Sequence, residues 1–186
     1  MVSQVNLRRE VIQHEIGHWV VARHHKIHAD YIEISEDSRG CYGHCNLFIF
    51  PRFNKIDDAR EMIEARIRTL MAGTAAQLIE RKTCVWDNVM KVFNSNGADD
   101  YTKISEYISL VSGFSSENFM DHDNTNEVYS RLFSKYWGEV VEIIKKHEND
   151  IRALTRYVLL KKHNGCDPLK VSTNELVSEI EKPQGR

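Results

Sequence analysis

The sequence lacks a long apolar segment, an excess of basic residues and a secretion signal, and each absence narrows the range of functions. No stretch approaches the ~18 consecutive apolar residues of a membrane-spanning helix, and the N-terminus has no apolar signal core. The 25 Lys and Arg are outnumbered by 27 Asp and Glu, so the net charge is −2 and no basic footprint for nucleic acid is present. We therefore expect a cytoplasmic protein with no membrane segment and no nucleic-acid partner.

Cysteine is also scarce, with four residues in a chain of 186. Four cysteines fit reduced, intracellular thiols. The segment Cys41-Tyr42-Gly43-His44-Cys45 has no matching Cys/His pair at zinc-finger spacing, so we expect no second metal site there. The length suits one domain with a real core, or such a core with a small appendage.

An H-E-x-x-H motif, His14-Glu15-Ile16-Gly17-His18, stands inside an apolar-periodic stretch that predicts a helix from about Leu7 to His25. Positions four apart share one helical face, so both imidazoles can reach one metal ion while Glu15 flanks it. This is the arrangement of a zinc hydrolase, in which the carboxylate deprotonates water. Apolar residues of the same stripe, which place the histidines on the core side, are Val11, Val21 and Ala22.

A catalytic zinc usually takes a third protein ligand, and two residues are candidates. His24 has the spacing of the last histidine in H-E-x-x-H-x-x-G-x-x-H enzymes, but Val21 stands where those enzymes need glycine. If the helix continues, His24 lies too far past His18 to converge on the same ion. Asp100 is the better candidate, because it leads an apolar stripe of the next predicted helix, formed by Ile104, Tyr107, Ile108 and Val111. The alternative for Asp100 is a simple partner of the helix dipole.

The coarse pattern predicts a mainly α fold of the α+β class. Residues 1–115 would form a helical core with a small β-sheet, and residues 116–186 a C-terminal helical bundle. After the first helix, the core is expected to contain strands at Tyr31–Ser35 and Cys45–Phe50, a long helix from about Asp57, a loop at Phe93–Ala98, and a helix from Asp99 or Asp100. A polar linker at Ser115–Asn126 should follow. The C-terminal part should contain two helices from Glu127 to His163, broken near Asn149, and a short terminal helix that begins with a capping box at Ser172 and Glu175.

At these segments the chain resembles the zinc peptidase domain of the FtsH-type AAA proteases. The segment Arg8–His18 is similar to that family's H-E-A-G-H helix, and Gly43–Pro51 to its edge strand beside the active site. Met71–Ile79 resembles its G-G-R-x-A-E-E-L helix, and Asn96–Tyr101 its loop with the third zinc ligand, which falls on Asp100. The resemblance implies a helical metallopeptidase core, a strand that holds substrate by β-augmentation, and hexameric self-association.

The chain departs from that family in two respects. Family members carry an ATPase module ahead of the peptidase, whereas 13 residues precede His14 here, and no G-x-x-x-x-G-K-[ST] motif occurs. The glycine pair, arginine and paired glutamates of the family's middle helix are replaced by Ala72-Gly73-Thr74 and Ala76-Gln77. We therefore expect no intrinsic ATP binding and no ATP-driven unfolding of substrates.

The expected function is that of a zinc-dependent endopeptidase acting on flexible peptides or unfolded proteins, independent of ATP on its own. One Zn2+ per chain is expected at His14, His18 and Asp100, with Glu15 as the catalytic general base.

Two other classes of protein remain open. One is a repressor-directed metallopeptidase of the ImmA/IrrE type, but nothing here matches the E-x-A-N-x-F-A helix that supplies its third carboxylate. The other is a non-proteolytic adaptor or regulator that keeps a zinc site. The presence of Glu15 argues against it, because a structural zinc site needs no general base.

Overall fold

The computed structural model describes residues 4–48, 53–79, 86–95, 97–114, 122–161 and 167–182. Within them the fold is mainly helical with a three-stranded antiparallel sheet, which confirms the predicted class. The elements are α1 (Gln4–His24), β1 (His28–Asp37), β2 (Gly40–Phe48), α2 (Ile56–Leu78), α3 (Trp86–Phe93), α4 (Ala98–Phe114), α5 (His122–Lys146), α6 (Glu148–Leu160), β3 (Leu169–Ser172) and α7 (Thr173–Glu181). None of the described helices has the length and apolarity to cross a bilayer.

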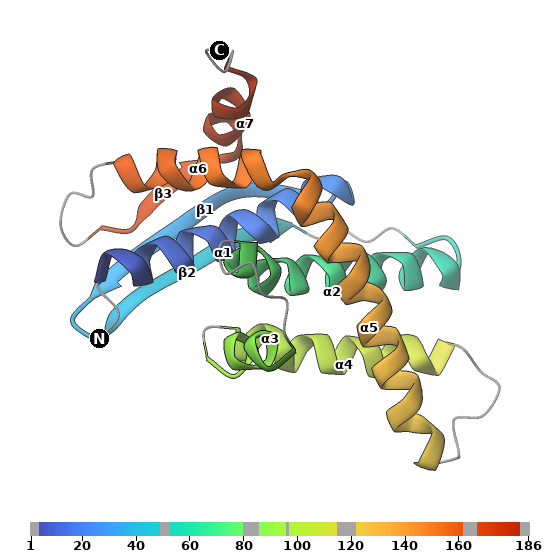
Figure 1. Ribbon diagram of the computed structural model, residues 1–186. Helices are drawn as coiled ribbons and strands as arrows, with labels where there is room; N and C mark the ends of the chain where they lie inside the picture. Colours follow the sequence, from blue (N-terminus) through green and yellow to red (C-terminus); the bar gives the residue numbers. More distant parts are fainter. Residues whose placement is uncertain are drawn as a thin grey trace.

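Helix α1 lies at the centre of the molecule. It contacts β1, β2, α2, α5 and α6, and Figure 1 shows it alongside the two long strands, with α2 and α4 on one side and α6 on the other. Every residue from Val11 to Ala22 is therefore buried, including those on the faces that a one-sided stripe would leave in solvent. The expected core-facing stripe is confirmed, but burial extends around the whole helix.

The sheet has the order β2-β1-β3, so β2 is an edge strand among the described residues. Strands β1 and β2 form an antiparallel hairpin from the pair His28 and Phe48 to the pair Asp37 and Gly40. Alternate residues of β1 point to one face, and the fully buried Ile32 and Ile34 place that face toward the core. The hairpin is longer than the sequence pattern predicts.

Several boundaries correct the expectations from sequence. Phe93 ends the helix α3, which the pattern missed, so the connection before α4 is shorter than the predicted loop. Helix α5 already begins at His122 inside the expected polar linker, whose residues 115–121 lie outside the described part of the chain. Residues 49–50 and 163, at the expected ends of a strand and a helix, also lie outside it.

The C-terminal residues return to the core. Strand β3 pairs with β1, Tyr31 opposite Ser172, where the sequence pattern indicated only closing helices. The predicted capping box at the start of α7 is confirmed: the backbone N–H of Glu175 donates to Ser172 Oγ at 3.3 Å, and that of Ser172 donates to Glu175 Oε2 at 2.9 Å.

Candidate metal centre

The two histidines of the H-E-x-x-H motif lie one turn apart on α1, both buried. His14 is 6 % exposed and His18 is 7 % exposed, and their ring centroids are 4.5 Å apart with the ring planes nearly perpendicular. Burial of two imidazoles in an apolar interior requires polar partners for their nitrogens. Those partners come from α2 and α4.

Asp100, in the first turn of α4, lies against both imidazoles. Its Oδ2 atom is 2.9 Å from His14 Nε2 and 3.1 Å from His18 Nε2. Ligand atoms of the three residues all lie within 4.8 Å of one another, and no other group of three His, Cys, Asp or Glu side chains in the described residues is so arranged. Residues 86 positions apart in the chain thus meet where the sequence predicts a metal site.

Helix α2 holds the opposite nitrogen of each imidazole. His18 Nδ1 lies 2.7 Å from the main-chain oxygen of Thr69, and His14 Nδ1 lies 3.2 Å from Gln77 Oε1. A carbonyl oxygen only accepts, so His18 Nδ1 carries a proton, and in the neutral ring Nε2 then presents a lone pair. The same assignment holds for His14 with the Gln77 oxygen as acceptor. Both Nε2 atoms are thereby turned toward Asp100, an orientation typical of histidines that ligate metal.

The donor set fits a divalent cation. In neutral histidines of this tautomer, two Nε2 lone pairs face one carboxylate oxygen, and like-charged lone pairs at about 3 Å repel unless a cation lies among them. Protonation of both rings would instead bury two imidazolium groups beside a single carboxylate, at a large desolvation cost. Two imidazole nitrogens and one carboxylate oxygen are the ligands of a catalytic zinc with an open fourth position. His14, His18 and Asp100 can therefore hold zinc.

The ionisation of Asp100 agrees with a cation-binding role. Without a metal ion, burial raises the pKa of this carboxyl, but positive charge and N–H donation from the imidazoles of His18 and His14 outweigh it, so the pKa lies well below its ordinary value. A cation bound between the three side chains would act in the same direction. Asp100 is accordingly an anion at all physiological pH values. Its neighbour Asp99 is exposed and does not belong to the group of possible ligands found among the described residues.

Glu15 is the third functional side chain of the motif and is 6 % exposed. Burial raises its pKa to about 7, although His14 and a hydrogen bond from the Cys45 backbone N–H act in the opposite direction. A carboxyl group with a pKa near neutrality can both accept and release a proton at working pH. In the metal-free site Glu15 therefore gains and loses its proton near neutrality, and a bound cation would favour its ionised form.

Two glycines make room for these side chains. A Cβ atom added to Gly73 of α2 would fall 2.5 Å from His14 Nε2, and one added to Gly43 of β2 would fall 2.5 Å from Glu15 Oε1. The closest neighbour of Gly73 is His14, one of the three residues that could hold the metal. A larger residue at either position would displace the functional group, so both glycines are needed at the site.

A cavity of about 210 Å³ opens beside the metal ligands. Glu15 lines it together with residues of β2 (Gly43 to Cys45, and Leu47), and α2 contributes Arg66 and Leu70. His24 lies elsewhere, exposed at the end of α1 beside a separate groove. The cavity therefore joins the edge strand to the H-E-x-x-H motif.

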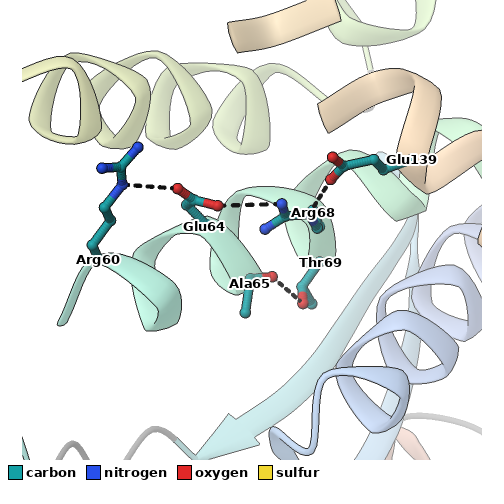
Figure 2. A network of polar contacts seen from close by, with 6 residues as sticks. All are labelled: Arg60, Glu64, Ala65, Arg68, Thr69 and Glu139. Carbon is teal, nitrogen blue, oxygen red and sulfur yellow. Dashed lines mark hydrogen bonds and ion pairs between the residues drawn. The ribbon is translucent and has the colours of Figure 1, made fainter. Parts of the chain in front are cut away.

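A chain of ion pairs on another face of α2 attaches that helix to α5. Figure 2 shows Arg60 bound to Glu64, Glu64 bound to Arg68, and Arg68 Nε bound at 2.6 Å to Glu139 Oε2 of α5. The hydroxyl of Thr69 donates to the Ala65 carbonyl, so only its main-chain oxygen serves His18. These contacts fix the helix that orients both imidazoles.

Neither the models of known protein families nor the curated proteins give a match to this chain. The chemistry of the site therefore rests on its own residues.

Proposed function

We propose that this protein is a zinc-dependent endopeptidase that cleaves flexible or unfolded polypeptides. The observation that carries the proposal is the convergence of His14 Nε2, His18 Nε2 and Asp100 Oδ2 in the interior, with Glu15 beside them at a cavity. The resemblance of the motif segments to FtsH-type peptidase domains supports the same reaction class. Retention of a buried carboxylate of raised pKa favours an enzyme over an adaptor with a structural metal.

Each residue has a defined task in this proposal. His14, His18 and Asp100 would hold the zinc ion, which supplies Lewis acidity toward water and toward the peptide carbonyl. Glu15 accepts a proton from water at its carboxylate and delivers it to the leaving amine nitrogen. Gln77 and Thr69 keep the imidazole tautomers and orientations that this requires.

Substrate would bind along β2. This strand pairs with β1 on one side only among the described residues, and Gly43, Cys45 and Leu47, which alternate along it, line the catalytic cavity. An extended peptide can add to such an edge by main-chain hydrogen bonds. Gly43 lies against Glu15, so a peptide on this edge would pass the general base. Extended binding requires flexible or unfolded substrates.

The proposed self-association rests on the resemblance, whereas the cellular setting and the independence from ATP rest on motifs that the sequence lacks. We propose a cytoplasmic, self-associating protein, with a hexameric ring as in FtsH-type peptidases, that acts without ATP when alone. Light scattering measures the assembly directly, and cleavage assays with and without ATP measure the energy requirement.

Cleavage of casein by the zinc-loaded chain tests the proposed chemistry. Wild-type protein should cleave it, a chelator should abolish cleavage, and added zinc should restore it. Glu15→Gln should retain zinc while losing cleavage by ~10²–10⁴-fold, the usual contribution of a general base. Zinc binding by a wild-type chain that cleaves no flexible substrate would favour the adaptor.

A further inference from the structure

Arg66 lies on the side of α2 that faces the metal centre. Arg66, Leu70, Gly73 and Gln77 are spaced by four, three and four residues, so they share one face of the helix. Two members of that face, Gly73 and Gln77, contact His14. Arg66 and Leu70 line the catalytic cavity. Arg66 is one turn from Thr69, whose carbonyl holds His18.

The guanidinium of Arg66 is incompletely satisfied. Its Nη1 atom is buried and has no hydrogen-bond partner in the part of the chain that the structure describes. The other arginines nearby on α2 differ, because Arg60 and Arg68 are paired with glutamates (Figure 2). A buried cationic donor without an acceptor is costly, and a guanidinium binds carboxylates with two parallel hydrogen bonds.

The acidic groups of the cavity do not serve as partners of Arg66. Asp100 is directed to the two histidines, and Glu15 accepts from the Cys45 backbone. Among the described residues Arg66 has no ion pair with a carboxylate, although Glu15, Asp99 and Asp100 line the same cavity. A ligand that enters this cavity can therefore supply the acceptor that Nη1 lacks.

The position of Arg66 relative to β2 indicates which part of a substrate it would meet. Arg66 and Cys45 line the same cavity, and the positive charge of Arg66 acts on the Cys45 thiol. Cys45 is two residues beyond Gly43, which packs on Glu15, and that separation is about 7 Å along a strand. A peptide on this edge, with its scissile bond beside Glu15, would bring a group one or two residues away to Arg66.

We propose that Arg66 is a specificity-determining residue that binds a substrate carboxylate one or two residues from the scissile bond. This rests on the proposed peptidase function for the location of the scissile bond. The carboxylate is either the C-terminus of a peptide or the side chain of Asp or Glu. In both cases the bidentate guanidinium recognises the same chemical group.

Binding of short unstructured peptides tests the proposal without turnover. The zinc-loaded chain carrying Glu15→Gln would be titrated by calorimetry with one peptide as its C-terminal acid and as its amide. A second pair, both amidated, would carry Glu or Gln near the centre. Tighter binding of the acid identifies a C-terminal carboxylate, and tighter binding of the Glu peptide identifies a side chain. A preference of about tenfold or more is expected in one pair.

Arg66→Met in the same background should abolish that preference while leaving the affinity of the uncharged peptide unchanged. Lys103→Met is the matched control, because Lys103 lines the same cavity with an exposed ammonium group. It should leave the preference intact. Arg66→Lys keeps the positive charge but loses the two parallel N–H donors of the guanidinium, so it should retain part of the preference for the carboxylate peptide. Circular dichroism would verify that each variant is folded.

Repetition of the titrations without zinc removes any contribution of a carboxylate that binds the metal. Three outcomes would each overturn the assignment of Arg66. The preference could disappear in the metal-free chain, it could be absent from both peptide pairs, or it could be lost through Lys103→Met and not through Arg66→Met. Arg66-dependent binding in a wild-type chain that cleaves nothing would leave the carboxylate-binding role of Arg66 standing and remove the peptidase, together with the placement of that carboxylate relative to a scissile bond. Cleavage without a carboxylate preference would support the peptidase function and overturn the role of Arg66.

Discussion

Gly73 lies against His14 so closely that a β-carbon at this position would fall 2.5 to 2.7 Å from three atoms of the imidazole ring. Contacts below 3.0 Å force a displacement, and the ring is held on its other nitrogen by Gln77. The absence of a side chain at position 73 is therefore required for the observed position of the His14 ring as well as for helix packing.

Gly73→Ala should displace the His14 ring and lower zinc affinity by at least about tenfold, with a loss of ~1–3 kcal/mol in stability from overpacking. Competition with a fluorescent zinc chelator and thermal unfolding measure the two effects. Gly138→Ala is the control, because Gly138 in α5 has no atom within 4 Å of an added Cβ. The control should gain ~0.5–1 kcal/mol, as expected for alanine in a helix. Equal zinc affinities in the two variants would contradict the role given to Gly73.

Asp100→Ala should lose bound zinc, because it removes the oxygen that both Nε2 atoms face. Elemental analysis of purified protein should give about one zinc per wild-type chain and much less for the variant. Asp99→Ala removes the adjacent carboxylate, which also lines the cavity, and should keep wild-type zinc content. Retention of zinc in Asp100→Ala together with its loss in His24→Ala would transfer the third-ligand role to His24.

Gln77→Ala should weaken zinc binding about 10- to 100-fold, the usual effect of losing a group that orients a ligating histidine. Gln77→Glu retains an oxygen acceptor at the same place and should preserve most of the affinity. Residue 77 is 3 % exposed, so both variants change a buried position. The comparison shows whether zinc binding depends on an oxygen acceptor for His14 at this position. Wild-type affinity in Gln77→Ala would show that Gln77 does not orient His14.

The raised pKa of Glu15 predicts a pH-dependent stability of the metal-free protein. Its pKa moves from an ordinary value of 4.5 to about 7, so the folded chain keeps a proton that the unfolded chain has already lost. Stability should therefore fall as pH rises from about 4.5 through 7, by roughly 3 kcal/mol from this group. Asp100 has a lowered pKa, and its stabilising contribution is lost only at acid pH below this window.

Urea unfolding of chelator-treated wild type and Glu15→Gln at several pH values measures this effect. The difference in unfolding free energy between the two should decline across the window and level off above pH 7. Bound zinc should flatten the decline, because its positive charge favours the ionised carboxylate. A difference that is constant with pH would show that Glu15 has an ordinary pKa in the fold.

The parts of the site that could be predicted are those with a local periodic signature. His14 and His18 are four residues apart on one face, and Asp100 leads the apolar positions Ile104 and Ile108, so helix geometry alone places all three inward. Their meeting depends on how α1, α2 and α4 pack. The pattern indicates which faces are buried but not which faces oppose each other.

The remaining parts lack such a signature for different physical reasons. The partner of His18 is a main-chain oxygen, which every residue carries, so no residue type marks Thr69. Strand β3 has four residues and depends on pairing with β1, so its short sequence carries no strand signal of its own and no element was predicted before Ser172. Helix α3, which was not predicted, does have a local signature, because its buried residues Val89, Val92 and Phe93 have helical spacing.

The burial of α1 by the surrounding elements should make local unfolding of this helix rare. Amide protons exchange with solvent most slowly where opening requires disruption of the whole core, and α1 is buried on all sides from Val11 to Ala22. His14, Glu15 and His18 thus occupy the segment that should open least often, whereas catalytic groups more commonly lie on loops. Amino-acid replacements on any side of this helix should accordingly be poorly tolerated, including at positions that never approach a substrate.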